Sequence, residues 1–166
     1  MLDNLDIKNI LKSEINFLRD GIKNSKNPYH TFTLCTLEKE FPKSRTVVLR
    51  HVEISPLKIS FNADYRSPKI KQLIDNSQCS ALFYDINRRV QIRMSCSSTI
   101  NYNNHISAKI WAKTALQSRK CYMGPHTPST TLDTYHPNIP LEYSKKDPDK
   151  ANSEEGYVNF VHVELS

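Results

Sequence analysis

The sequence predicts a mainly β fold of the α+β type, a small antiparallel β-barrel with peripheral helices. Segments rich in β-branched and aromatic residues succeed one another between Thr31 and Tyr102. Most connections between them are too short for the crossover helix that a parallel pair needs, so neighbouring strands are expected to run antiparallel. Closure into a barrel would leave few exposed sheet edges. With 166 residues the chain is long enough for a real core, and we expect a single domain over 1–166.

An amphipathic helix is expected within residues 1–23. Apolar residues recur every three or four positions between Ile7 and Ile22, which is the spacing of one helix face. Asp3 or Asn4 would cap its start, and Gly21 with the polar segment after it marks its end.

Alternating and β-branched segments predict the remaining elements. Strands are expected at 31–41, 45–54 and 57–63, with FPKS (41–44) as the turn between the first two. A helix follows at 66–77, then strands at 79–86, 90–102 and 156–165, with a short helix at 105–114. Residues 118–150 carry five prolines and little periodicity. The part from 124 to 150 is expected to be a long loop, which is usually functional or mobile.

Composition narrows the class of protein. Lys and Arg number 23 against 17 Asp and Glu, a net charge of +6 that is spread along the chain and suggests anionic partners without indicating nucleic acid. The four cysteines form no CxxC pair, so we expect no metal site and a reduced, cytoplasmic protein. No stretch approaches the roughly 20 apolar residues that cross a bilayer, so no membrane partner is expected.

The segment RSPK at 66–69 carries the clearest chemical signal. A helix start offers free backbone N–H groups and the positive end of the helix dipole, so it favours an anion. Ser67 is a good N-cap residue and adds a hydroxyl, while Arg66 and Lys69 add cations that are unfavourable there unless something negative is bound. The pattern predicts a phosphate site; a solvated turn with incidental cations is the alternative.

Three further residues are candidates for contact with a ligand bound at this segment. Arg45 and Arg50 are expected on one strand, five positions apart, with side chains on opposite faces. Arginine suits bidentate phosphate contact, although a surface salt bridge is its commoner use. Gln91 can pair with the carbonyl and ring nitrogen of a planar heterocycle, because an amide both donates and accepts.

Together these segments resemble the FMN-binding split-barrel family of pyridoxamine 5′-phosphate oxidase. The segments are RTVVLR (45–50), NADYRSPK (62–69) and VQIRMSC (90–96), and the likeness spans 30–125. In that family the corresponding segments line the flavin. The resemblance implies a Greek-key split β-barrel, FMN as the cofactor, and a homodimer with FMN at its interface.

The resemblance also implies which residues form the site. Asn62 and Ala63 would give backbone contacts to the ring, Gln91 would meet the isoalloxazine edge, and a loop of the other subunit near Thr127 would complete the site. The implied cofactor-binding residues are Arg45, Val47, Val48, Arg50, Asn62, Ala63, Arg66, Ser67, Lys69, Gln91, Arg119 and Ser129.

The sequence departs from the oxidase where a substrate would bind. Cys96 stands in place of a usual glycine, Ser55 in place of a substrate lysine, and Trp111 and Ala115 in place of a tyrosine and an arginine. The oxidase's C-terminal substrate motif is not in the sequence. We therefore expect an FMN-dependent oxidoreductase with an unassigned small-molecule substrate and unassigned catalytic residues. The alternatives are a non-catalytic flavin-binding or cofactor-less barrel and, less favoured, a nucleic-acid-binding barrel.

Overall fold

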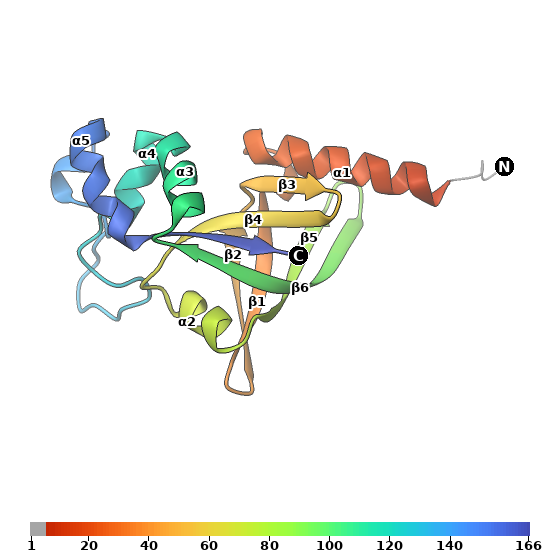
Figure 1. Cartoon of the computed structure of the whole chain (residues 1–166), viewed down its shortest axis with the longest axis horizontal. Helices are drawn as coiled ribbons and strands as arrows, with labels where there is room; N and C mark the ends of the chain where they lie inside the picture. The colour runs from red at the N-terminus through yellow and green to blue at the C-terminus, as the bar shows by residue number, and fades with distance from the viewer. Residues whose placement is uncertain (1–5) are drawn as a thin grey trace. The chain divides into compact units, whose positions relative to one another are not determined.

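The computed structural model describes residues 6–166 and divides them into two compact units. The first holds the chain up to Phe61, Gln78–Ser98 and Glu164–Ser166; the second holds Asn62–Ser77 and Thr99–Val163. A seven-stranded sheet with strand order β2-β1-β5-β6-β7-β4-β3 supplies the strands of both (Figure 1). The registered strand pairs are antiparallel, which confirms the mainly β, antiparallel fold predicted from the sequence.

The strands and helices follow the predicted order except that four strands, instead of three, precede the second helix and that two further short helices follow the third. The strands are β1 (Thr31–Glu38), β2 (Phe41–Val48), β3 (His51–Ile54), β4 (Leu57–Asp64), β5 (Gln78–Asp85), β6 (Val90–Tyr102) and β7 (Phe160–Leu165). The helices are α1 (Ile7–Lys23), α2 (Pro68–Asp75), α3 (His105–Lys113), α4 (Leu116–Arg119) and α5 (Lys150–Ser153).

An aromatic core fixes which side of the strands faces inward in the first unit. Side chains alternate along β1, so Phe32 and Leu34 are buried while their neighbours are half-exposed. The ring centroid of Phe32 lies 4.9 Å from that of Phe83 on β5 and 6.1 Å from that of Phe61 on β4. Such aromatic contacts add to the free energy of burial. Residues directly opposite each other on antiparallel strands lie on the same face, so the residues paired with Phe32 and Leu34 also face the core.

The start of α1 is capped by Asp6, whose side chain accepts a hydrogen bond from the Lys8 N–H at 3.0 Å. The expected caps, Asp3 and Asn4, lie outside the described residues. The helix ends at Lys23, within the expected range and at the start of the polar segment that follows Gly21.

A charged cluster ties α1 to the turn between β5 and β6. Arg88 donates to Glu14 at 2.7 Å and also to Asp85, and its guanidinium lies 3.7 Å from the ring centroid of Phe17. Hydrogen bonding from Arg88 holds the pKa of Asp85 below its usual value. Burial would raise the pKa of Glu14, but its hydrogen bonds from Arg88 and Tyr29 outweigh burial and lower it. Burial, with the bond to Glu14, raises the pKa of Tyr29 to about 12.

The prediction of a turn at FPKS is wrong. The chain reverses two residues earlier, where Lys39 adopts a left-handed backbone with φ 57°, and residues 41–44 already belong to β2. Pro42 is tolerated there because β2 is an edge strand of the sheet. The single strand expected at 45–54 is in fact β2 and β3, interrupted after Val48, so Arg45 and Arg50 do not lie on one strand.

The second unit has its own aromatic core, built by Trp111, Tyr122 and Phe160. Asn104 begins α3 with a capping box, as its position predicted. The loop expected at 124–150 is irregular except for a 3-10 turn at Leu141–Tyr143 and the first residue of α5, whereas the preceding residues from 118 belong to the end of α4 and to a 3-10 turn at Lys120–Tyr122. The last strand begins at Phe160 instead of 156, because residues Glu154–Asn159 form a 3-10 turn.

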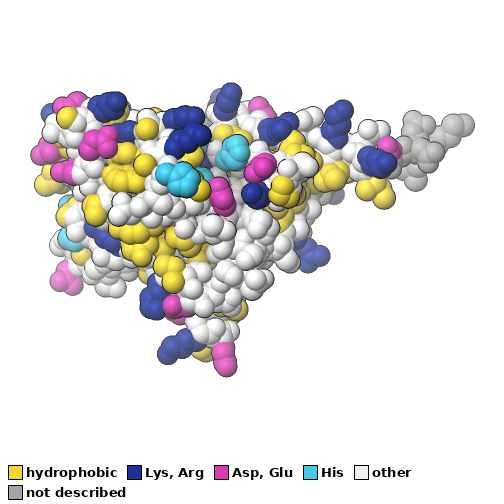
Figure 2. All heavy atoms as spheres, in the orientation of Figure 1, with side chains coloured by type: hydrophobic (Ala, Val, Ile, Leu, Met, Phe, Trp, Pro, Cys, Tyr) yellow, Lys and Arg dark blue, Asp and Glu magenta, His cyan; other side chains and the backbone are white. Residues whose placement is uncertain are grey.

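Figure 2 shows basic and acidic side chains interspersed on the visible face of the molecule. This distribution fits the spread of charge along the sequence and gives no basic track on that face. Among the described residues no helix is long and apolar enough to cross a membrane.

Candidate functional site

The turn between β4 and α2 gathers the cations of the RSPK segment in the second unit. β4 ends at Asp64, and the Ser67 N–H and hydroxyl both donate to the Asp64 carbonyl oxygen, at 3.0 and 2.6 Å. Lys69 Nζ in turn donates to Ser67 Oγ at 3.1 Å. Ser67 holds the N-cap position of α2 as predicted, but its side chain does not cap the helix. The backbone N–H groups at the start of α2 are therefore not capped by this side chain.

Arg66 is oriented by two protein acceptors. Its Nε donates to Asp64 Oδ1 at 3.0 Å, and its Nη2 donates to Asp64 Oδ2 at 2.7 Å and to the Gly124 carbonyl at 3.0 Å. The hydrogen bonds that Arg66 donates to the Asp64 carboxylate raise the pKa of Arg66, so the guanidinium stays charged. Its Nη1 has no acceptor among residues 6–166, and the side chain is 26% exposed. Two N–H groups of a fixed guanidinium are thus left for a ligand.

The charges of this turn fit a phosphate. Arg66 and Lys69 carry two positive charges against the single carboxylate of Asp64, which is almost fully buried. The positive end of the α2 dipole adds to this excess. Charge-assisted hydrogen bonds from a guanidinium, an ammonium and backbone N–H groups are the contacts that a phosphate takes in proteins. We name these residues, Asp64 to Lys69, the phosphate turn.

The strand residues expected near the flavin ring lie on two faces of the sheet in the first unit. Arg45 pairs with Leu34 and Val47 with Phe32, so both lie on the core side. Arg45 Nη1 donates to Thr36 Oγ1 at 2.6 Å, and burial lowers the pKa of Arg45.

Val48 and Gln91 lie on the opposite, outward side. Val48 pairs with Thr31 at the end of β2, and Gln91 on β6 pairs with the exposed Tyr84 on β5. Arg50 is exposed between β2 and β3, where its backbone N–H donates to the Ser60 carbonyl at 2.8 Å. The four residues on strands, Arg45, Val47, Val48 and Gln91, are therefore not gathered on one face of the sheet.

The other expected ring contacts lie in the second unit. Asn62 Oδ1 is 2.8 Å from Nδ1 of the buried His162, and Ala63 is buried beside it on β4. Ser129 lies exposed in the irregular segment, with a left-handed backbone at φ 70°.

Arg119 is engaged in the helical core, where it is one of the residues that line a cavity of about 200 Å³. Its Nη1 donates to Glu154 at 2.6 Å and to Ser153 at 3.0 Å, while Nη2 donates to the Trp111 carbonyl at 2.8 Å. Nε donates to the Thr114 carbonyl at 3.2 Å, and the side chain is 2% exposed. Hydrogen bonds from Trp111 and Arg119 lower the pKa of Glu154, which keeps it ionised. This geometry gives Arg119 a structural role, and its contact with the flavin stays a prediction.

Three residues that organise the phosphate turn were missed at the level of sequence. Asp64 orients Arg66, Gly124 accepts from it, and Asn138 packs against Gly124. A β-carbon at Gly124 would lie 2.2 Å from the Asn138 carbonyl oxygen, so only glycine fits there. Asp64 could have been recognised from the sequence as a partner of Arg66, because a carboxylate lies only two residues before the arginine. The contact between Arg66 and Gly124 leaves no such local signal.

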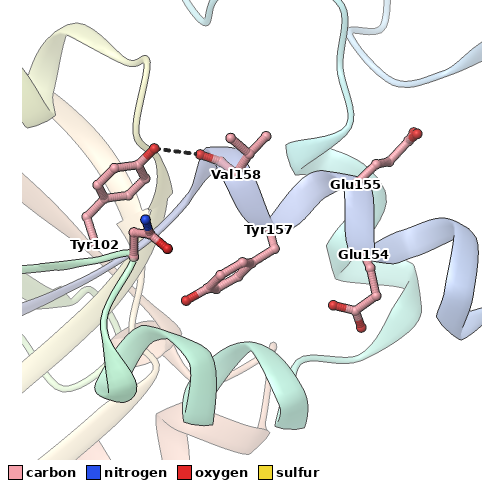
Figure 3. A pocket seen from close by; sticks show the side chains of 6 residues that line it. Tyr102, Glu154, Glu155, Tyr157 and Val158 are labelled. Carbon is pink, nitrogen blue, oxygen red and sulfur yellow. Dashed lines mark hydrogen bonds between the residues drawn. The ribbon is translucent and has the colours of Figure 1, made fainter.

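A separate cavity of about 320 Å³ lies elsewhere in the second unit (Figure 3). Tyr102, Glu154, Glu155, Tyr157 and Val158 are among its lining residues, and the Tyr102 hydroxyl donates to the Val158 carbonyl at 2.9 Å. Figure 3 shows the Glu155 side chain pointing away from Glu154. Across the described part of the chain, no group of three or more side chains is arranged to bind a metal ion.

The antiparallel sheet and the cationic turn at the start of α2 define the class as a split-barrel protein. The family model "Pyridoxamine 5′-phosphate oxidase, FMN-binding domain" matches residues 11–101, more than half of the chain. The chain belongs to this family.

Solved structures show the same fold. An FMN-binding protein related to pyridoxamine 5′-phosphate oxidase from Nostoc punctiforme PCC 73102 is 20% identical, with TM-score 0.72, covering 93% of this chain and 79% of that one. PhzG from Burkholderia lata 383, solved with tetrahydrophenazine-1-carboxylic acid, is 14% identical, with TM-score 0.58, covering 94% and 73%. A Clostridium acetobutylicum protein related to general stress protein 26 is 10% identical, with TM-score 0.57, covering 96% and 83%. Among curated proteins no sequence match was found.

Proposed function

We propose that this protein binds FMN, with the flavin phosphate held at the phosphate turn. The single observation that carries the proposal is the guanidinium of Arg66, which Asp64 and Gly124 fix in place while Nη1 stays available. Lys69 and the start of α2 supply further positive charge to the same turn. Membership of an FMN-binding family supports the proposal.

The residues of this chain would hold and orient the cofactor. Arg66, Ser67 and Lys69 would bind the phosphate, and Asn62, Ala63 and Gln91 would contact the ring. Arg45, Val47, Val48 and Arg50 would border the ring, and Ser129 would serve the site of a second subunit in a homodimer. Bound FMN would supply hydride and electron transfer, which no side chain of a protein provides alone.

The proposed activity is that of an FMN-dependent oxidoreductase acting on a small molecule. The rival is a flavin-binding protein without turnover, because the residues that hold the oxidase's substrate are altered in this sequence. The four thiols are free in the structure, which fits a reducing compartment, and we propose a cytoplasmic location.

Titration with FMN tests the proposal. The purified protein is expected to carry the visible absorption of bound flavin, or to acquire it with micromolar affinity. Lys69→Ala is expected to weaken FMN binding about 10-fold, the value of a charge-assisted hydrogen bond. The matched control is Lys71→Ala, which removes a lysine of the same helix that pairs with Asp75 on the surface.

Each outcome has a distinct meaning. A protein that neither contains nor binds FMN would contradict the proposed function. Equal FMN affinity in the wild type and Lys69→Ala would show that the phosphate binds outside this turn. Bound FMN that neither a nicotinamide cofactor nor an amine substrate reduces would favour the rival without turnover.

A further inference from the structure

We propose that occupation of the phosphate turn stabilises the segment Gly124–Asn138, so that the two are thermodynamically coupled. This inference rests on the proposed function, because it concerns the site where the FMN phosphate would bind. It adds a regulatory element to that site. This element is a segment distant in sequence, which becomes more ordered when phosphate binds and less ordered when phosphate leaves. All residues involved belong to the second unit.

Arg66 is the link between the two. Both N–H groups of its Nη2 are used, one on Asp64 Oδ2 and the other on the Gly124 carbonyl, and Nε is used on Asp64. Only Nη1 is left for phosphate. A phosphate can therefore bind Arg66 without displacing Gly124, and it restricts the same guanidinium that holds the Gly124 carbonyl in place.

The segment beyond Gly124 is closed by Asn138. Its Oδ1 accepts from the His126 N–H at 3.0 Å, and its Nδ2 donates to the His126 carbonyl at 2.9 Å. The Asn138 N–H donates to His136 Nδ1 at 2.9 Å. A β-carbon on Gly124 would lie 2.7 Å from Asn138 Oδ1, so the backbone held by Arg66 packs directly against this clasp. We call these contacts of Asn138 with His126, His136 and Gly124 the asparagine clasp.

The sign of the coupling follows from this connectivity. A phosphate that fixes Arg66 restricts the backbone of Gly124, and this restriction favours the closed asparagine clasp. In the other direction, a closed clasp holds the Gly124 carbonyl and so keeps Arg66 in position to bind phosphate. Coupling between two sites is reciprocal, so loosening the clasp must weaken phosphate binding by the factor with which phosphate stabilises the clasp. Coupling of this kind typically amounts to about 5-fold or more.

Hydrogen exchange tests one direction of the coupling. The probes are inorganic phosphate and FMN, and the readouts are the amides of His126 and Asn138. Saturation with either probe is expected to slow exchange of both amides about 5-fold in the wild type. Arg66→Lys keeps a cation but has a single nitrogen, which cannot serve Asp64, Gly124 and phosphate together, so this protection should disappear.

Affinity tests the other direction. Asn138→Gly removes the clasp while accommodating the left-handed backbone of this residue, whose φ is 52°. The matched control is Asn103→Gly, because Asn103 has a similar φ of 47° and takes no part in the clasp. Asn138→Gly is expected to bind FMN about 5-fold more weakly, and Asn103→Gly to bind it as the wild type does.

The outcomes separate this inference from the proposed function. Ligand binding that leaves exchange of both amides unchanged, together with wild-type affinity in Asn138→Gly, would overturn the coupling and leave FMN binding intact. Failure of the wild type to bind either FMN or phosphate would overturn both.

Discussion

Two arginines of the second unit, Arg66 and Arg119, each pair with a carboxylate, yet their surroundings give them different uses. Arg119 is 2% exposed, and each of its three nitrogens donates to a protein acceptor. Arg66 is 26% exposed and keeps Nη1 without an acceptor among the described residues. The difference shows that an arginine's role is decided by which of its donors remain unused.

Arg88 of the first unit shows that exposure alone does not decide the role. It is 28% exposed, close to the value for Arg66. Its Nε donates to Asp85, and Nη1 and Nη2 both donate to Glu14. Arg88 is thus partly accessible to water but engaged at every nitrogen, and we assign it to stability.

The largest effect is expected from Arg119→Ala. The change removes four hydrogen bonds, leaves the Trp111 and Thr114 carbonyls without this donor and opens a cavity, so we expect a loss of about 3 kcal/mol in the free energy of unfolding. Urea denaturation measures this loss. The exposed Arg19→Ala is the control and should stay within about 0.5 kcal/mol of the wild type. Wild-type stability in Arg119→Ala would contradict the structural role.

The next effect is expected from Arg66→Ala, and it should appear in binding more than in stability. Losing a charge-assisted contact is expected to weaken FMN binding by about 10-fold or more. The free energy of unfolding should fall by only about 1 kcal/mol, because Asp64 keeps the backbone N–H of residue 66. Isothermal titration and urea denaturation measure the two effects. A large loss of stability with unchanged FMN affinity would show that Arg66, like Arg119, has a structural role instead of a binding role.

The smallest effect is expected from Arg88→Lys, and it should depend on pH. The folded pKa values of Asp85 and Glu14 lie below their ordinary values of 3.8 and 4.5. Depressed carboxylate pKa values stabilise the folded state above the ordinary pKa, and this stabilisation is lost as the pH falls through the folded pKa. The stability gap between the wild type and Arg88→Lys should therefore be full near neutral pH and shrink below about pH 4. Urea midpoints across this range measure it, and a constant gap would contradict the assignment.

The sequence predicted the elements whose cause is local. The spacing of apolar residues predicted α1, and Asn104 and Pro68 marked the starts of α3 and α2. The turn predicted at FPKS is wrong because proline favours turns but is also tolerated in an edge strand. That β2 lies at the edge of the sheet is not visible in the local sequence.

Part of the site could be predicted for the same reason. Arg66, Ser67 and Lys69 are neighbours in the chain, and a helix start brings them together without help from the rest of the fold. The role of Gly124 could not be predicted, because it depends on a contact across 58 residues of chain. The flavin contact expected for Arg119 stays a prediction. Its hydrogen bonds to Trp111 and Glu154 could not be predicted, because they depend on how the helical core packs.

Trp111 gives the second unit an optical signal of its own. It is the sole tryptophan of the chain, it lies 4.5 Å from the Arg119 guanidinium, and its Nε1 donates to Glu154 at 2.9 Å. Its fluorescence therefore reports on the helical core, whereas circular dichroism in the far ultraviolet averages over every strand and helix. Comparing the two signals during unfolding would show whether the two units melt as one cooperative body or in succession.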